Sequence, residues 1–259
     1  MKKVLVIVTL IVCGAAIILG NLHWNEKISA QGESTATNIE QADENKKEEQ
    51  VESESDNLVY AVNLPEKLQE KIKEATDPDK PVKFVIFGTS EAEGTWIDSF
   101  TKELAANYGK EVFEITVIST GDNSTREIVN EGTFEEINQL NPDVLLFEPP
   151  MLKDNGNVGI SNTLSNLEKM FESWQEVNKE LVLMVQPPNP LYAATYYPSE
   201  VQQLQKFTEG NDLIYLNHWD NWPALDDVKM KDYLTEDNKA NEKGYAIWAE
   251  YLTEYFVAK

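Results

Sequence analysis

Five short apolar runs, each followed by a turn, constrain the fold of this chain more than any other feature. They read as strands over 82–87, 112–119, 143–147, 181–186 and 212–217. Helical spacing of apolar residues occurs over 64–75, 96–108, 125–129, 133–140, 160–179, 199–207 and 242–256. The runs do not alternate polar and apolar residues, so both faces of each strand are expected to be covered. The pattern predicts an α/β domain, namely a three-layer, doubly wound, mainly five-stranded parallel sheet.

Local signals also predict helix ends. Gly109 is placed to cap the helix over 96–108 at its C-terminus, because glycine accepts the backbone conformation that ends helices. Thr133 and Glu136 have the spacing of a capping box, which predicts a further helix start at this point.

The N-terminus has the pattern of an export signal. Lys2 and Lys3 precede an apolar stretch over 4–20, whose length suits either a short membrane span or a long signal-peptide core. Residues 1–22 are therefore predicted to be an uncleaved signal anchor or a cleaved signal peptide. The two lysines favour an N-terminus that stays inside, with the rest of the chain outside.

Residues 23–57 have a different composition from the rest of the chain. They are rich in Glu, Ser, Asn, Gln and Lys, and such a segment buries too little apolar surface to offset its ordering entropy. We expect a disordered acidic linker there and one folded domain over 58–259. The domain would lie outside a cell membrane on a single-pass anchor, or be secreted if the signal is cleaved.

Composition excludes several classes of function. The formal net charge is −23, which repels phosphate backbones and argues against nucleic-acid binding. Cys13 is the one cysteine, and the two histidines are His23 and His218, so cysteine-based and multi-histidine zinc sites are excluded. The sequence has no Gly-x-Gly-x-x-Gly or Walker pattern. Composition leaves a carboxylate-only Mg²⁺ or Ca²⁺ site open, but the sequence has no loop signature for one. We expect no metal and no cofactor.

The loops that follow the strands carry the candidate site residues. In a doubly wound sheet, ligands bind beyond the carboxyl ends of the strands. Ser90 follows the first strand, Gly121 the second, Asn155 the third and His218 the fifth. A serine at a strand-to-helix turn can expose its hydroxyl near backbone N–H groups that stabilise an oxyanion. Each of these residues also suits an ordinary turn, cap or core position.

Taken in order, these loops resemble the SGNH (GDSL-type) hydrolase superfamily over most of 82–257. In that family a Gly-Asp-Ser motif follows the first strand, a glycine the second and an asparagine the third. An Asp-x-x-His motif precedes the last helix. Gly88-Thr89-Ser90 resembles the first block, with Thr in place of Asp. The segment Asn241-Glu242-Lys243-Gly244-Tyr245 resembles the residues after the family histidine, which puts Lys239 at the histidine position and Glu236 at the aspartate position.

The resemblance implies Ser90 as nucleophile, with Gly121 and Asn155 as oxyanion donors. Family members are esterases, lipases, carbohydrate deacetylases and O-acetyltransferases, some of them exported enzymes that act on cell-wall or capsular polysaccharide. The implied function is an extracytoplasmic serine esterase or acyltransferase acting on an acylated glycan or another small ester. Four aromatic residues would suit stacking on sugar rings: Trp96, Tyr192, Trp219 and Trp222.

A lysine at the histidine position leaves the base of this reaction open. A serine hydroxyl is a poor nucleophile until a base takes its proton. His218 could supply the base, with Asp220 or Glu236 orienting its ring. Lys239 could act as an unusual desolvated base. In a third reading, the domain is a catalytically inactive glycan-binding or scaffold module tethered to the membrane.

Overall fold

The computed structural model describes residues 58–259, except residues 76 and 78. The predicted signal segment 1–22 and linker 23–57 lie outside the described residues. Within the described part of the chain, no helix is long and apolar enough to cross a membrane.

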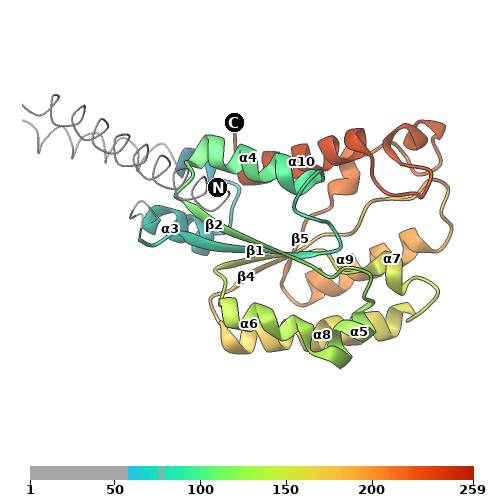
Figure 1. Ribbon diagram of the computed structural model, residues 1–259, viewed down its shortest axis with the longest axis horizontal. Helices are drawn as coiled ribbons and strands as arrows, with labels where there is room; N and C mark the ends of the chain where they lie inside the picture. The colour runs from blue at the N-terminus through green and yellow to red at the C-terminus, as the bar shows by residue number, and fades with distance from the viewer. Residues whose placement is uncertain (1–57, 76, 78) are drawn as a thin grey trace, which may run out of the picture. The chain divides into compact units, whose positions relative to one another are not determined.

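A five-stranded parallel sheet forms the middle layer of the domain, as predicted (Figure 1). Its strands are β1 (Val82–Gly88), β2 (Phe113–Ser119), β3 (Val144–Phe147), β4 (Val182–Val185) and β5 (Ile214–Tyr215). The order across the sheet is β2-β1-β3-β4-β5. The direction of winding therefore reverses between β1 and β3, and such a switch point opens a crevice at the carboxyl ends of the strands.

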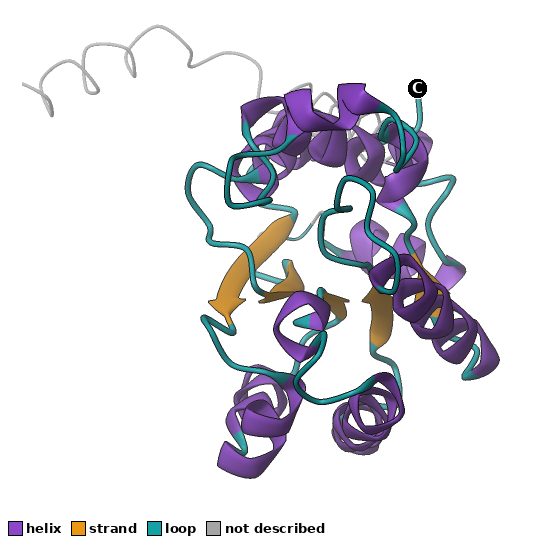
Figure 2. Ribbon diagram, turned by 90° about the vertical axis from the view of Figure 1, so that its right-hand side faces the viewer, coloured by secondary structure: helices purple, strands orange, loops and turns teal. Residues whose placement is uncertain are grey.

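Helices cover both faces of the sheet (Figure 2). They are α3 (Glu66–Glu74), α4 (Trp96–Tyr108), α5 (Thr125–Glu131), α6 (Glu136–Leu140), α7 (Met151–Asp154), α8 (Ile160–Val177), α9 (Tyr197–Gly210) and α10 (Glu242–Phe256). Phe84 and Ile86 of β1 pack into a core with α3, α4 and α10. Val85 and Phe87 point the other way, into a core with α5, α6, α8 and α9. This alternation follows from the two-residue period of a strand.

Some local details differ from the sequence prediction. Strand β5 is shorter than the predicted run, because Asp212 adopts φ 56° and the chain enters the 3₁₀ turn His218–Asn221 soon after Tyr215. The capping box is formed by Ser124 and Glu127 at the start of α5, and not by Thr133 and Glu136. Gly132 ends α5 with φ 71°, so the chain passes directly into the 3₁₀ turn Thr133–Glu135.

Candidate active site

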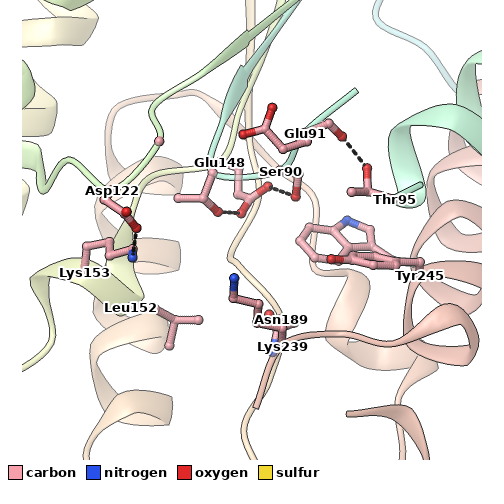
Figure 3. A pocket seen from close by; sticks show the side chains of 13 residues that line it. Ser90, Glu91, Thr95, Asp122, Glu148, Leu152, Lys153, Asn189, Lys239 and Tyr245 are labelled. Carbon is pink, nitrogen blue, oxygen red and sulfur yellow. Dashed lines mark hydrogen bonds and ion pairs between the residues drawn. The ribbon is translucent and has the colours of Figure 1, made fainter. Parts of the chain in front are cut away.

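A cavity of about 320 Å³ lies at the carboxyl edge of the sheet (Figure 3). The loops after β1, β2, β3 and β4 contribute to its walls, together with the loop before α10 and the first turns of that helix. Its size lies at the lower end of the range for small-ligand sites. The loops that the sequence singles out thus meet around one cavity.

Ser90 lies on the wall of this cavity in the turn between β1 and α4. Its Oγ donates a hydrogen bond to Oε2 of Glu148 at 2.9 Å (Figure 3). It also accepts one from the indole N–H of Trp96 at 2.9 Å. The side chain that caps α4 is Thr95, which accepts from the backbone N–H of Ile97. The Ser90 hydroxyl therefore does not cap the helix; its partners are Glu148, which also lines the cavity, and the buried Trp96.

Glu148 is the acidic residue at the centre of the site. It follows β3 directly and is only 2% exposed, and its Oε1 accepts a hydrogen bond from the Thr89 hydroxyl. Burial raises the pKa of Glu148 to about 7, although hydrogen bonds from Thr89, Ser90 and Trp96 act in the opposite direction. A Cβ atom on Gly88 would lie 2.6 Å from the Glu148 Cβ, so this close approach requires glycine.

Sequence reasoning did not select Glu148, although one signal was present. A charged residue directly after a fully apolar strand is unusual, because carboxylates are rarely buried without partners. That signal, together with its place at the strand's carboxyl end, could have marked Glu148 as a functional candidate.

His218 does not reach Ser90, which corrects its interpretation as the base. The ring is fully buried; Nε2 donates to the carbonyl of Pro187 at 2.9 Å, and Nδ1 accepts from the Trp222 indole at 3.1 Å. It stacks on Trp248, with ring centroids 3.9 Å apart. Burial lowers the pKa of His218 to about 3. Both ring nitrogens are occupied, so His218 is a structural residue in this arrangement.

The acidic residues proposed to orient His218 also lie elsewhere. Asp220 is exposed and accepts a hydrogen bond from the Asn217 side chain at 2.7 Å. Glu236 is exposed and lines a separate cavity of about 290 Å³, together with Tyr192 and Lys231. Neither carboxylate contacts the histidine ring, because the ring's two polar atoms bond to Pro187 and Trp222.

Lys239 lines the Ser90 cavity from the loop before α10 (Figure 3). The side chain is exposed, and Asn189 holds its loop by donating to the carbonyl of Asn238 at 3.0 Å. A second cation, Lys153, forms an ion pair with Asp122. The hydrogen bond and charge of Lys153 lower the pKa of Asp122, and the charge of Lys239 adds to this effect. The cavity therefore presents two cations opposite the Ser90–Glu148 pair.

Comparison with known proteins gives matches in fold only. No family model and no curated protein matches the sequence. A GDSL-like lipase from Bacteroides thetaiotaomicron matches with a TM-score of 0.52 at 13% identity, over 69% of this chain and 89% of its own. A carbohydrate esterase family 3 protein from Talaromyces cellulolyticus matches with a TM-score of 0.56 at 12% identity, over 66% and 94%. A catalytic mutant of an acetylxylan esterase from Geobacillus stearothermophilus matches with a TM-score of 0.51 at 11% identity, over 67% and 93%.

The domain has the SGNH-type fold. This result agrees with the resemblance found in the sequence, and the turn after β1 lies at the carboxyl edge of the sheet, where doubly wound folds bind ligands. At such low identity the likeness establishes the fold, and any chemistry has to be argued from the side chains in the cavity.

The two predicted oxyanion donors of this SGNH-type domain are occupied. Gly121 lines the cavity, but its backbone N–H donates to the Ser119 hydroxyl at 3.1 Å. Asn155 is exposed, is not among the residues that line the cavity, and donates to Glu200 at 2.7 Å. The cause is helix α7, which the sequence analysis did not predict and which carries the chain away from β3 before Asn155 is reached.

The aromatic residues predicted to stack on sugar rings mostly serve the core. Trp96 is 0% exposed and Trp222 only 7%, so their faces are not available to a ligand and that prediction is wrong for both. Trp219 is partly buried and donates its indole N–H to the carbonyl of Pro188. Lys231 lies over the ring of Tyr192, 4.5 Å from its centroid.

Among the described residues, no group of three or more His, Cys, Asp or Glu side chains could hold a metal ion.

Proposed function

We propose that this protein is an extracytoplasmic SGNH-type serine esterase or acyltransferase that acts on O-acyl groups of cell-envelope or capsular polysaccharide. Ser90 attacks the acyl carbonyl, and the acyl group passes to water or to a second hydroxyl. The observation that carries this proposal is the Ser90 hydroxyl itself. It lines a cavity at the ligand-binding edge of the fold and is hydrogen-bonded to a buried carboxylate.

The cavity suits a polar ester with a small acyl group. Its volume is about 320 Å³, and most of its lining side chains are polar or charged. Leu152 and Tyr245, both partly buried, supply apolar contacts for a short acyl group or one face of a sugar. The fold neighbours include a carbohydrate esterase and an acetylxylan esterase, which supports an acylated glycan as the substrate class.

The location outside the membrane rests on the N-terminal sequence. Lys2 and Lys3 before the apolar stretch 4–20 favour export of everything that follows. Protease treatment of intact cells that produce the protein should degrade the domain if it is displayed outside. Full protection in intact cells, with degradation after lysis, would contradict this part of the proposal.

Labelling with a serine-reactive fluorophosphonate tests the activity. Purified full-length protein should label, and should release p-nitrophenol from p-nitrophenyl acetate and acetate from an acetylated polysaccharide. Ser90→Ala should abolish all three signals, whereas Ser99→Ala, which changes an exposed serine of α4, should keep them. Equal labelling of wild type and Ser90→Ala would reject Ser90 as the nucleophile. Methanol or a soluble oligosaccharide as acceptor then separates transfer from hydrolysis.

A second function is favoured by one observation. Lys239 lines the cavity where the family resemblance puts a histidine, and His218 is occupied elsewhere, so the site lacks an imidazole base. A glycan-binding or scaffold module does not need a base, so a site without an imidazole would suit it. It predicts a folded protein that retains an acetylated polysaccharide in a pull-down, fails to react with the fluorophosphonate, and loses binding when the cavity is filled by Ser90→Trp.

A further inference from the structure

The SGNH-type site described above lacks an imidazole but contains one carboxylate in direct contact with the serine. Ser90 Oγ lies 2.9 Å from Glu148 Oε2, within the range for proton transfer between two oxygen atoms. We propose that Glu148 is the general base that takes the proton from Ser90, in the role that the family resemblance gives to a histidine. This inference rests on the proposed function, because it names the base of the same reaction.

Two partners fix the orientation of the Ser90 hydroxyl. Trp96 donates its indole N–H to Oγ at 2.9 Å, so the single hydroxyl proton is left to point at Glu148. Trp96 is itself held by stacking on Trp248, with ring centroids 5.2 Å apart and planes 17° apart. Among the described residues, Trp96 and Glu148 are the side chains that bond to this oxygen. Its remaining lone pair is available for attack on a carbonyl carbon.

Burial gives Glu148 the basicity that an ordinary carboxylate lacks. Its side chain is 2% exposed, and burial raises its pKa to about 7. A base with a pKa near the working pH combines a large deprotonated fraction with useful proton affinity. The hydroxyls of Thr89 and Ser90 keep the charged form bound within the site, so the buried carboxylate is not left without partners.

Other titratable groups lie around Glu148 and must be distinguished from it. They are Glu91, Asp122, Lys153, Lys239, Tyr197 and Tyr245. Burial raises the pKa of both tyrosines, so neither loses its proton near neutral pH. Glu91 accepts from the Ser119 hydroxyl, and Asp122 is paired with Lys153, so both carboxylates have partners other than Ser90.

The replacement of the family aspartate by Thr89 fits the same arrangement. The Thr89 hydroxyl donates to Oε1 of Glu148. An aspartate at this position would put a second carboxylate against the first, and two like charges in a buried site disfavour each other's ionisation. Threonine instead supplies a donor that holds the base in place, which makes Thr89 a positioning residue for Glu148.

The reaction balances with Glu148 as the sole proton carrier. In the first half, the Ser90 O–H proton moves to Oε2 while Oγ bonds to the acyl carbonyl carbon. The bond from that carbon to the leaving oxygen then breaks, and the leaving alcohol takes the proton from Glu148. In the second half, water or an acceptor hydroxyl gives its proton to Glu148 and attacks the acyl carbon. The bond to Ser90 Oγ breaks, and the proton returns to Oγ.

The test uses purified full-length protein and p-nitrophenyl acetate. For wild type, kcat/KM should rise with pH through a single ionisation near 7, because only the carboxylate form accepts the proton. Glu148→Gln keeps the shape of the side chain but removes the base, and should lower kcat/KM by about 10²–10⁴-fold and remove that ionisation. Glu148→Asp withdraws the carboxylate from Ser90 and should give an intermediate rate that still depends on pH.

Asp154→Asn is the matched control, because Asp154 is also a buried carboxylate bonded to hydroxyls, those of Thr125 and Thr163. It should keep the wild-type pH profile in folded protein, as checked by circular dichroism. Should Ser90→Ala abolish turnover while Glu148→Gln retains it with an unchanged profile, Glu148 is not the base but the serine esterase stands. Should folded wild type neither turn over the ester nor react with the fluorophosphonate, the proposed function fails and the inference fails with it.

Discussion

Glu148 and His218 are two buried titratable side chains in different regions of the same domain, and their contacts differ in kind. Glu148 is 2% exposed and bonds to two hydroxyls, both from residues that line the cavity. His218 is 0% exposed and bonds to a backbone carbonyl and an indole N–H. Trp248 stacks on the His218 ring and also lines the cavity. Burial raises the pKa of Glu148 to about 7 and lowers that of His218 to about 3.

Contacts, and not residue type, decide which of these two groups can take a proton from Ser90. Imidazole is the usual base at neutral pH, yet here its two nitrogens hold backbone and core together. A carboxylate is usually too acidic to be a useful base, yet burial beside a serine hydroxyl changes that.

The largest expected effect is on stability in acid. His218 takes up a proton near pH 6.5 in the unfolded chain and only near pH 3 in the folded chain. Its contribution to the free energy of unfolding is therefore fully present above pH 6.5 and decreases as the pH falls toward 3. The difference corresponds to about 5 kcal/mol. His218→Phe keeps a ring against Trp248 but cannot titrate, so urea melts between pH 7 and 4 should show a flatter dependence than wild type. Parallel curves of unfolding free energy against pH for the two proteins would show that His218 is not held neutral in the folded chain.

Glu148 should act on stability in the opposite direction. The folded chain holds its proton up to about pH 7, whereas the unfolded chain releases it near 4.5. The contribution of Glu148 to the free energy of unfolding is therefore fully present below pH 4.5. It decreases by about 3 kcal/mol as the pH rises through 7. Urea melts of Glu148→Gln should lack this decline between pH 5 and 8. If the wild-type minus variant difference does not change with pH, Glu148 does not hold its proton in the folded state.

The arrangement of strands, helices and the cavity could be predicted from the sequence. All five strands and both helical layers follow from apolar periodicity, which is local. The cavity's place follows from strand order and the turn at Gly88-Thr89-Ser90, because ligands bind where parallel strands end. These features need no knowledge of which side chains meet.

The pairing inside the site depends on contacts between distant segments. Glu148 becomes a partner of Ser90 because β1 and β3 are neighbours and Gly88 permits their loops to approach. His218 becomes structural because α10 brings Trp248 against its ring. Asn155 leaves the site because helix α7 intervenes after β3. Spacing along the chain does not encode these three outcomes, so it could not show that His218 is bonded in the core and that Asn155 is absent from the cavity lining.

A smaller effect is expected from the two tryptophans that donate an indole N–H, one to Ser90 and the other to His218. Trp96→Phe removes the donor to Ser90 Oγ while keeping a ring against Trp248. The loss of one hydrogen bond is worth about 1 kcal/mol, so fluorophosphonate labelling should slow by about fivefold. Trp222→Phe removes the donor to His218 Nδ1 and should leave labelling of folded protein unchanged while lowering its melting temperature. Equal slowing in both variants would mean that the effect comes from core packing.

The smallest effect is expected where the family resemblance would predict the largest, at Lys239→His. This change restores the motif residue, and Glu236 already stands at the aspartate position. In the folded domain, however, residue 239 is exposed, and Glu236 faces the separate cavity beside Tyr192. A new imidazole would therefore lack an orienting carboxylate, and Ser90 would still give its proton to Glu148.

Turnover of p-nitrophenyl acetate by Lys239→His should stay within about threefold of wild type, as expected for one exposed charge. Lys243→His, on the exposed side of α10, is the control for adding a histidine. A tenfold gain in Lys239→His alone, with a new ionisation near 6.5, would show that the cavity accepts a histidine base and that Glu148 is replaceable.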